Sequence, residues 1–242
     1  MNDSRRIALI TGGSKGIGKA CVTQLSEQGF KVLIHYRSGK DEAEALAASL
    51  PEAETFGADL SDPEAAQSMM KDIKAKHGRL DVLVNNAGVC IDQLVMLAKE
   101  DAFDKMFSTN MKSIFVMSKF ASRLMLKQKW GRIVNITSVV GHMGNPGQSL
   151  YSSTKGAVTA FTKSIASELA SVGITCNCIA PGFIKTAMTD KLNDEQKAGL
   201  MERIPMKRMG TPEDIASAVG FLVSDSAAYI SGTTIHVNGG MY

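Results

Sequence analysis

The sequence predicts an α/β fold in which a doubly wound, parallel, seven-stranded sheet is flanked by helices. Short apolar, β-branched runs alternate with longer amphipathic stretches along the chain, which is the pattern of successive strand-helix-strand units. A glycine-rich turn separates the first apolar run from the first amphipathic stretch. The 242 residues are 44% hydrophobic, enough for one sizeable core, so we expect a single domain over residues 1–242.

Each predicted strand is a short apolar run bounded by glycine, proline or polar residues. The predicted strands cover residues 7–10, 31–36, 54–58, 80–84, 133–136, 173–180 and 233–237. Apolar positions spaced by three or four residues predict the helices between them. The predicted helices begin near Ala20 and Ser149 or cover residues 41–50, 63–77, 99–128 and 211–223.

Local signals refine several of these elements. Asp62 before Pro63 predicts an N-cap with proline at the first helical position, and Thr211 to Asp214 predicts a second capped start. Asn110 is unusual within the long 99–128 helix, because asparagine competes with the helix backbone for hydrogen bonds. Residues 141–147 hold three glycines and a proline and predict a loop. Residues 183–208 are methionine-rich and weakly periodic, which predicts a mobile cover.

Composition and charge argue against several classes of protein. The formal net charge of +3 is spread along the chain, without the basic run that would indicate binding to nucleic acid or a membrane. The four cysteines lack zinc-type spacing, so no metal site is predicted. Only four consecutive apolar residues precede Thr11, too few for a signal peptide or a membrane span. We therefore expect a cytoplasmic protein.

The glycine-rich turn is a candidate binding site for a nucleotide. Thr11 leads into glycines at 12, 13, 16 and 18, between the first predicted strand and the first predicted helix. Such a turn brings backbone N–H groups and a helix dipole up to a pyrophosphate. Its spacing differs from the common Gly-x-Gly-x-x-Gly form, so the prediction rests on its place in a Rossmann-type chain.

The end of the second predicted strand indicates which dinucleotide would bind. A site that prefers NAD is expected to carry a carboxylate there, to hold the ribose 2′-hydroxyl. The sequence reads His35-Tyr36-Arg37-Ser38, and no carboxylate follows before Asp41. Arg37 and Lys15 could instead pair with a 2′-phosphate, which favours NADP(H). The alternative is that both are solvated surface charges.

The stretch from Asn135 to Ile165 contains the candidate catalytic residues. Ser138 lies at the tip of a buried strand, and Tyr151 and Lys155 share one face of the next helix. We expect the lysine to lower the pKa of the tyrosine, so that the pair can move a proton near neutral pH. Ser138 could then hydrogen-bond a substrate carbonyl. The alternative is an ordinary amphipathic pair beside a strand-end hydroxyl.

The order of these motifs resembles the short-chain dehydrogenase/reductase family from end to end. The motifs are the glycine turn, Asn85-Asn86-Ala87-Gly88, Asn110, Ser138, Tyr151-x-x-x-Lys155 and Pro181-Gly182. Further segments are similar to bacterial reductases of 3-oxoacyl thioesters on acyl carrier protein, namely Ser138-Val-Val-Gly, Met143-Gly-Asn, Gly147-Gln148, Ala180-Pro-Gly-Phe-Ile184, Ala227-Ala-Tyr-Ile230 and His236-Val-Asn-Gly-Gly-Met-Tyr242. The resemblance implies NADPH-dependent reduction of 3-oxoacyl-(acyl-carrier-protein) to the 3-hydroxyacyl product in fatty-acid elongation.

The resemblance also implies a role for each matching residue. Tyr151 would be the general acid, and Ser138 would orient the carbonyl. Lys155 would modulate Tyr151 and bind the nicotinamide ribose, while Asn110 would hold a water that relays protons. The glycines would hold the pyrophosphate, and the other contacts would hold the adenine, the riboses and the nicotinamide. The residues implied to bind the cofactor are Gly12, Ser14, Lys15, Gly16, Ile17, Gly18, Arg37, Asp59, Leu60, Asn86, Ala87, Gly88, Tyr151, Lys155, Pro181, Gly182, Ile184 and Thr186.

Partners are implied in the same way. Relatives are commonly homotetramers, and acyl carrier protein would dock on a basic cluster that includes Lys127, Lys129 and Arg132. The position before Gly173, often arginine in those relatives, is Val172 here. Three alternatives stay open. The basic cluster could simply complement a helix dipole, the same chemistry could act on acetoacetyl-CoA or another small ketone, or the chain could be a non-catalytic nucleotide-binding regulator.

Overall fold

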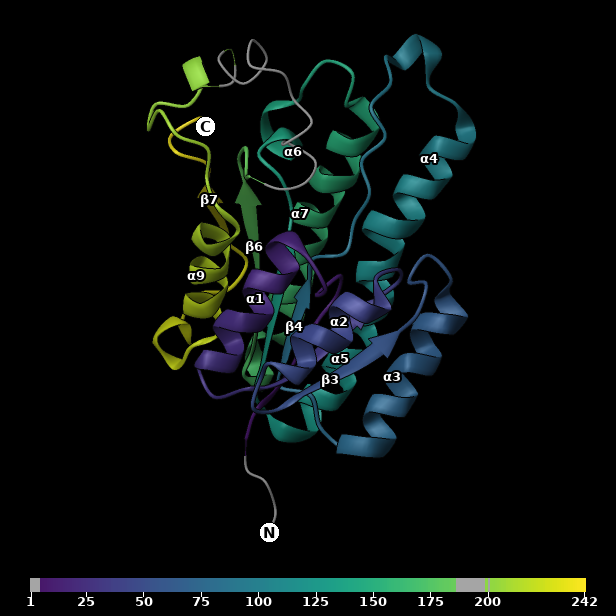
Figure 1. Cartoon of the computed structure of the whole chain (residues 1–242), viewed down its shortest axis with the longest axis vertical. Helices are drawn as coiled ribbons and strands as arrows, with labels where there is room; N and C mark the ends of the chain where they lie inside the picture. The colour runs from purple at the N-terminus through teal and green to yellow at the C-terminus, as the bar shows by residue number, and fades with distance from the viewer. Residues whose placement is uncertain (1–4, 186–198, 200) are drawn as a thin grey trace.

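The computed structural model describes residues 5–185, 199 and 201–242 (Figure 1). Its strands form one sheet in the order β3-β2-β1-β4-β5-β6-β7, and every neighbouring pair is parallel. This confirms the predicted seven-stranded parallel sheet, with strand ends within a residue or two of those expected. The strands are β1 (Ile7–Ile10), β2 (Lys31–Tyr36), β3 (Ala53–Gly57), β4 (Val82–Asn85), β5 (Gly131–Ile136), β6 (Ile174–Pro181) and β7 (Thr234–Val237).

Helices cover both faces of the sheet. The described helices are α1 (Gly16–Glu27), α2 (Lys40–Ala48), α3 (Pro63–His77), α4 (Glu100–Phe107), α5 (Ser113–Gln128), α6 (Val140–Met143), α7 (Ser149–Leu169) and α9 (Pro212–Val223). Buried side chains of α1, α2 and α9 form one core, and those of α3, α5 and α7 form another. Alternate residues of β1 contribute to the two cores, as period-two side chains must. None of the helices in the described part of the chain is long and apolar enough to span a membrane.

The strand order places a crevice between β1 and β4. The chain builds outward from β1 to β3 and then returns to the other side of β1 to build β4 through β7. In open α/β sheets, ligands bind outside the carboxyl ends of the strands at such a switch point. The glycine turn after β1 and the Asn85-Asn86-Ala87-Gly88 segment at the end of β4 both lie there.

Both predicted helix caps are confirmed. The Asp62 side chain accepts a hydrogen bond from the Glu64 N–H at 2.9 Å, and Pro63 occupies the first position of α3. Thr211 and Asp214 form a reciprocal capping box at the start of α9, with hydrogen bonds of 3.3 and 2.8 Å. Each cap satisfies backbone donors that the helix itself leaves unpaired.

The long helix predicted over residues 99–128 is confirmed, with one interruption. Between α4 and α5 the chain makes a π-helical turn over Ser108–Lys112, and Asn110 lies in it with no exposed surface. Single π-turns inside α-helices often occur at functional sites. The asparagine that is unfavourable for an ordinary helix therefore marks a real irregularity.

The loop predicted over residues 141–147 is wrong in its first half. Residues Val140–Met143 form the single turn α6, closed by a hydrogen bond from the Met143 N–H to the Val139 carbonyl at 3.1 Å. Val139 and Val140 are buried, so their packing holds the turn despite the glycine that follows. Residues 186–198 and 200, most of the predicted cover, lie outside the described residues.

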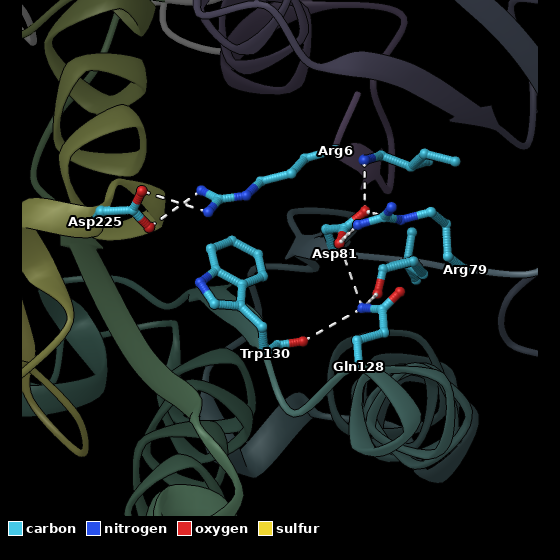
Figure 2. Close-up of polar contacts among 8 residues, drawn as sticks. Arg6, Arg79, Asp81, Gln128, Trp130 and Asp225 are labelled. Atoms are coloured by element: carbon cyan, nitrogen blue, oxygen red, sulfur yellow. Dashed lines mark hydrogen bonds and ion pairs between the residues drawn. The ribbon is translucent and has the colours of Figure 1, made fainter. Parts of the chain in front are cut away.

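A polar cluster lies at the amino-terminal edge of the sheet, where the strands begin, at the end opposite the crevice (Figure 2). Asp81, 1% exposed, accepts hydrogen bonds from the Ile7 N–H at 2.8 Å and from the Arg79 guanidinium at 2.6 and 3.0 Å. Beside it, the Arg6 guanidinium lies 4.0 Å from the centroid of the Trp130 ring and pairs with Asp225 at 3.1 Å. The cluster ties β1 and β4 to the segments that follow α5 and α9.

Arg132 belongs to this edge and not to a docking surface. It is 3% exposed, its guanidinium lies 4.3 Å from the centroid of the Trp130 ring, and it donates a 2.9 Å hydrogen bond to the Gly131 carbonyl. The expectation that Arg132 contacts a partner is therefore wrong, because packing against Trp130 buries it. Lys127 and Lys129 are exposed, as expected.

Candidate functional site

The glycine turn shapes the start of α1 for close approach by a ligand. Gly12 and Gly16 have positive φ angles of 62° and 54°, which L side chains rarely adopt. A Cβ on Gly18 would collide with the Gly12 carbonyl oxygen and lie 2.6 Å from the Asn86 side-chain nitrogen. Lys15, the N-cap residue of α1, gives the helix no side-chain hydrogen bond. The first N–H groups of α1 thus suit an anion such as a pyrophosphate.

A second set of contacts braces this turn from β4. The Thr11 hydroxyl oxygen accepts hydrogen bonds from the N–H groups of Asn86 and Ala87 at 2.9 and 3.0 Å. The Asn86 side chain in turn donates to the carbonyls of Thr11 and Gly12 at 2.9 and 3.1 Å. Asn86 was expected to contact a ribose, and here its amide holds the turn itself.

The three candidate catalytic side chains line one cavity of about 420 Å³. Ser138 follows β5, and Tyr151 and Lys155 lie in the first two turns of α7, so the carboxyl end of the sheet and the helix bring them together. The expected cofactor residues that line the same cavity are Gly12, Lys15, Ile17, Asn86, Ala87, Gly88, Pro181, Gly182 and Ile184. Thr186, also expected there, lies outside the described residues.

Lys155 is held as a buried donor. It is 3% exposed, and its Nζ donates a hydrogen bond to the Ile136 carbonyl at 2.9 Å. The same Nζ lies 5.6 Å from the centroid of the Tyr151 ring. Burial lowers the pKa of Lys155 to about 8, because the charged ammonium loses its hydration. Its positive charge is therefore sensitive to pH just above neutrality.

Tyr151 behaves differently from the expectation. Burial raises its pKa above the ordinary value for a phenol, and a hydrogen bond with Ser138 only partly offsets this effect. The expected lowering of the Tyr151 pKa is wrong here, because burial and the negative charges of Cys90 and Asp92 all raise this pKa, and Lys155 does not offset them. At neutral pH Tyr151 is thus a protonated phenol, hydrogen-bonded to Ser138 and able to donate a proton.

Asn110 secures the wall of the cavity from the π-turn. Its side-chain oxygen accepts a hydrogen bond from the Val89 N–H at 2.8 Å, and its nitrogen donates to the Val89 carbonyl at 2.8 Å and to the Thr154 hydroxyl at 3.2 Å. A Cβ on Gly88 would lie 3.2 Å from the Asn110 oxygen and 3.6 Å from Lys155 Nζ. Asn110 thereby links the β4 end to α7 beside Lys155.

An adjoining cavity of about 190 Å³ continues beyond the glycine turn to the ends of β2 and β3. The expected residues that line it are Gly12, Ser14, Lys15, Arg37, Asp59, Leu60, Ala87 and Gly88. Hydrogen bonds from Ser61, helped by the charge of Arg37, lower the pKa of Asp59, so it is ionised at neutral pH. The cavity therefore holds the Asp59 carboxylate together with two cationic side chains, Lys15 and Arg37.

The two cavities together fit an extended dinucleotide. They share Gly12, Lys15, Ala87, Gly88 and Val89, so they form one path from Arg37 to Tyr151. Glycines line the middle of that path, where a phosphate must approach the backbone. Arg37 lies at one end of the path, Lys15 lines both cavities, and the candidate proton donor Tyr151 lies at the other end.

Sequence reasoning missed a polar group in the catalytic cavity. The Cys90 thiol donates to the Asp92 carboxylate at 2.9 Å, and the Gln148 amide donates to the same oxygen at 3.0 Å. Burial and the Asp92 carboxylate raise the pKa of Cys90 to about 12, so it is a hydrogen-bonding thiol rather than a nucleophile. The sequence feature that could have predicted this group is the position of its members, because Cys90 closely follows Gly88 and Gln148 directly precedes α7.

The basic residues expected at a docking surface lie at the other end of the sheet. Lys127 lies in the last turn of α5, Lys129 follows the helix with a left-handed φ of 52°, and both precede the amino end of β5. Ser138 follows the carboxyl end of that same strand. The six residues of β5 span about 20 Å, so the two lysines are well separated from Ser138 of the same chain.

Comparisons with known proteins show the family of the chain. A family model described as "Enoyl-(Acyl carrier protein) reductase" matches residues 12–242. A 3-oxoacyl-(acyl-carrier-protein) reductase FabG of Staphylococcus aureus is 46% identical over 239 residues, covering 97% of each chain. The FabG proteins of Haemophilus influenzae and Escherichia coli K12 are 46% and 45% identical over 238 and 243 residues, covering 98% and 100% of this chain and 98% and 99% of their own.

These matches run through the glycine turn, the π-turn and the α7 helix, and they extend over nearly the full length of both partners. The sheet order and the Ser138, Tyr151 and Lys155 cavity are consistent with them. The chain therefore belongs to the short-chain dehydrogenase/reductase family.

Proposed function

We propose that this chain is an NADPH-dependent oxidoreductase that reduces 3-oxoacyl-(acyl-carrier-protein) to the 3-hydroxyacyl thioester in fatty-acid elongation. The observation that carries the proposal is the meeting of Ser138, Tyr151 and Lys155 around one cavity that adjoins the smaller cavity lined by Lys15 and Arg37. Family membership implies a nicotinamide cofactor, and the names of the FabG relatives support the choice of substrate.

The chemistry follows from the protonation states of these side chains. The bound cofactor would supply a hydride to C3 of the substrate. Ser138 and Tyr151 hydrogen-bond the C3 oxygen, and Tyr151 gives it a proton, so hydride and proton together convert the ketone to an alcohol. The Lys155 ammonium then stabilises the phenolate that is left. Asn110, through its place beside Lys155, belongs to the route by which that proton is replaced.

The cofactor preference rests on the far end of the path. Lys15 and Arg37 line the smaller cavity, and no carboxylate occupies positions 35–38 to hold a 2′-hydroxyl. NADP(H) is the cofactor that this charge suits. An Arg37→Ala variant is expected to lose affinity for NADPH while its affinity for NADH changes little.

The carrier protein is the proposed macromolecular partner, through Lys127 and Lys129. Replacing both lysines with glutamate is expected to lower kcat/KM for a carrier-protein thioester and to leave the CoA thioester unaffected. Lys71→Glu combined with Lys74→Glu, two exposed charge reversals on α3, is the matched control. Equal loss with both thioesters would show that the lysines do not act as a docking surface.

Assembly and cellular location complete the proposal. The family resemblance suggests a homotetramer of single-domain chains, each an NADP(H)-binding unit over residues 1–242. The described part of the chain leaves Phe103, Phe115 and Leu126 of the α4 and α5 helices 42–46% exposed, and such a face suits a subunit interface. A cytoplasmic location remains a prediction from the sequence.

One assay separates the proposed function from its alternatives. NADPH and NADH oxidation are followed in parallel with acetoacetyl thioesters of carrier protein and of CoA, and with an enoyl thioester that lacks the C3 oxygen. The proposal predicts NADPH-dependent turnover that is fastest on the carrier protein and absent with the enoyl thioester. Equal rates on CoA would favour a small-thioester reductase, and NADPH binding without turnover would favour a regulator.

A further inference from the structure

His35 is a buried histidine beside the nucleotide path, and the chemistry described above does not use it. It lies near the end of β2, is 2% exposed and lines the smaller cavity with Arg37 and Asp59. A histidine at such a place needs partners for both ring nitrogens, because an unpaired buried polar atom is costly.

Both nitrogens have partners, and each partner comes from a different strand end. The Gly12 N–H donates to His35 Nδ1 at 3.0 Å, and Nε2 lies 3.0 Å from the Ala58 carbonyl oxygen after β3. The Gly13 N–H also donates to the His35 carbonyl at 2.8 Å. His35 therefore joins the glycine turn after β1 to the segment that carries Asp59.

These partners allow only one protonation state. A backbone N–H can only donate and a carbonyl can only accept, so Nδ1 must be the acceptor and Nε2 must carry the hydrogen. A doubly protonated ring would place the Nδ1–H against the Gly12 N–H, two donors facing each other. Protonation of His35 and the observed position of Gly12 are therefore incompatible.

We propose that His35 is a positioning residue for the cofactor, whose neutral ring holds the glycine turn in place, and that protonation of the ring releases the turn and weakens cofactor binding. This inference rests on the proposed nicotinamide-cofactor function. It adds a residue that acts through Gly12 and a pH dependence located at the pyrophosphate contact.

The charged groups around His35 define the pH range. Burial lowers the pKa of His35, while its hydrogen bond to Ala58 and the negative charge of Asp59 oppose that effect. Arg37 and Lys15 are the other charged groups that line the same cavity. The ring is thus neutral at pH 7, and the weakening of cofactor binding belongs to the acidic side of the ordinary histidine range.

The test compares cofactor binding by wild-type protein and three variants, by titration of the reduced cofactors followed by their fluorescence. His35→Phe keeps a ring but has no hydrogen-bond acceptor. It is expected to weaken the binding of NADPH and of NADH by the same factor, about 5- to 100-fold, because the Gly12 N–H is left unpaired. Turnover at saturating cofactor is expected to stay near the wild-type rate. His35→Asn is expected to recover most of the affinity, because its amide oxygen can take the place of Nδ1.

Arg37→Ala is the matched control, because it changes the ratio of NADPH to NADH affinity whereas His35→Phe leaves that ratio unchanged. The pH dependence is measured with NADH, which lacks the titrating 2′-phosphate. The wild-type dissociation constant is expected to rise several-fold from about pH 7 to about pH 5, and that of His35→Asn to stay flat. Urea unfolding followed by the fluorescence of Trp130 shows whether each variant is folded.

The inference is overturned if His35→Phe binds both cofactors as the wild type does, or if His35→Asn keeps the wild-type pH dependence. If His35→Phe does not fold, the His35→Asn pH comparison decides alone. Failure of the wild-type protein to bind either reduced cofactor would instead overturn the proposed function on which the inference rests.

Discussion

At the scale of single residues, burial decides the chemistry of the catalytic cavity. Lys155 is buried and Tyr151 is partly buried, so loss of hydration disfavours the charged form of each, and their pKa values move in opposite directions. Tyr151 is left protonated, and Lys155 is left with a pKa of about 8. The pair is thus prepared to give a proton in reduction, provided that Lys155 remains charged.

This ionisation predicts the alkaline limb of the pH profile. Lys155 loses its proton as pH rises through about 8, and with it the charge that stabilises the Tyr151 phenolate. We expect kcat/KM for NADPH in the reductive direction to fall above about pH 8, because this parameter reports ionisations of the free enzyme. A profile that stays flat from about pH 7 to about pH 10 would contradict the assigned role of Lys155.

At the scale of elements, the glycine turn and α1 are packed so closely that side chains are excluded. Gly18 lies against both the Gly12 carbonyl and the Asn86 amide. These two groups are hydrogen-bonded to each other in the crevice between β1 and β4. A change at Gly18 therefore moves the turn that the cofactor must contact. By contrast, a Cβ on Gly156 in α7 would meet only the Gly141 carbonyl oxygen, at an ordinary 3.4 Å.

The two glycines give a matched pair of variants. Gly18→Ala is expected to weaken NADPH binding by at least about tenfold, because the added methyl group forces the turn outward. Gly156→Ala is expected to bind NADPH normally and to be at least as stable, since alanine favours a helix interior. Calorimetric titration with NADPH measures both, and equal affinities for the two variants would show that Gly18 is not sterically required.

The buried polar cluster around Asp81 is expected to matter for stability alone. Asp81 is buried and accepts from Ile7, Arg79 and Gln128, whereas Asp225 pairs with Arg6 at the surface (Figure 2). Asp81→Asn should lower the free energy of unfolding by about 2–4 kcal/mol, and Asp225→Asn by less than about 1 kcal/mol. Urea titrations compare them, and a larger loss for Asp225→Asn would reverse this ranking.

At the scale of the whole molecule, the sequence was sufficient for the sheet and for the location of the site. Strands and most helix ends follow from local periodicity and caps such as Asp62, which act within a few residues. The π-turn at Asn110, the α6 turn and the burial of Arg132 could not be predicted in this way. Each depends on tertiary packing, namely the contact of Asn110 with the distant Val89, the burial of Val139 and Val140, and the stacking of Arg132 on the nearby Trp130.

The same limit applied to the candidate site. The spacing of Tyr151 and Lys155 predicted that they meet, but the direction of the Tyr151 pKa depends on burial, which spacing does not contain. The two ring partners of His35, Gly12 and Ala58, come from separate strand ends that only the folded sheet brings together. Residue type and position located the site, and tertiary packing determined its electrostatics.

An ion cluster that joins β2, β3 and α3 predicts how the molecule responds to acid. Burial alone would raise the pKa of Glu54, but hydrogen bonds from Lys31 and Lys76 and the charge of His77 lower it to about 2. A carboxylate with a lowered folded-state pKa stabilises the fold above its unfolded pKa. That contribution is lost as pH falls from about 4.5 through about 2.

Glu54→Gln is therefore expected to reduce the free energy of unfolding by about 1–3 kcal/mol at pH 7, with the difference from wild type shrinking as pH falls towards about 2. Glu52→Gln, in the more exposed pair with Arg5, is the control and should change stability little. Urea unfolding followed through Trp130, the single tryptophan, measures both. A difference that does not depend on pH would rule out the Glu54 carboxylate as its source.

The most direct test of the central claim is the rate of NADPH oxidation by Tyr151→Phe with a 3-oxoacyl-(acyl-carrier-protein) substrate. The variant keeps the ring and its packing but lacks the proton that Tyr151 gives to the C3 oxygen. We expect turnover to fall by at least about 100-fold, with NADPH binding retained. Wild-type turnover by Tyr151→Phe would contradict the account, because the proton would then have to come from another group.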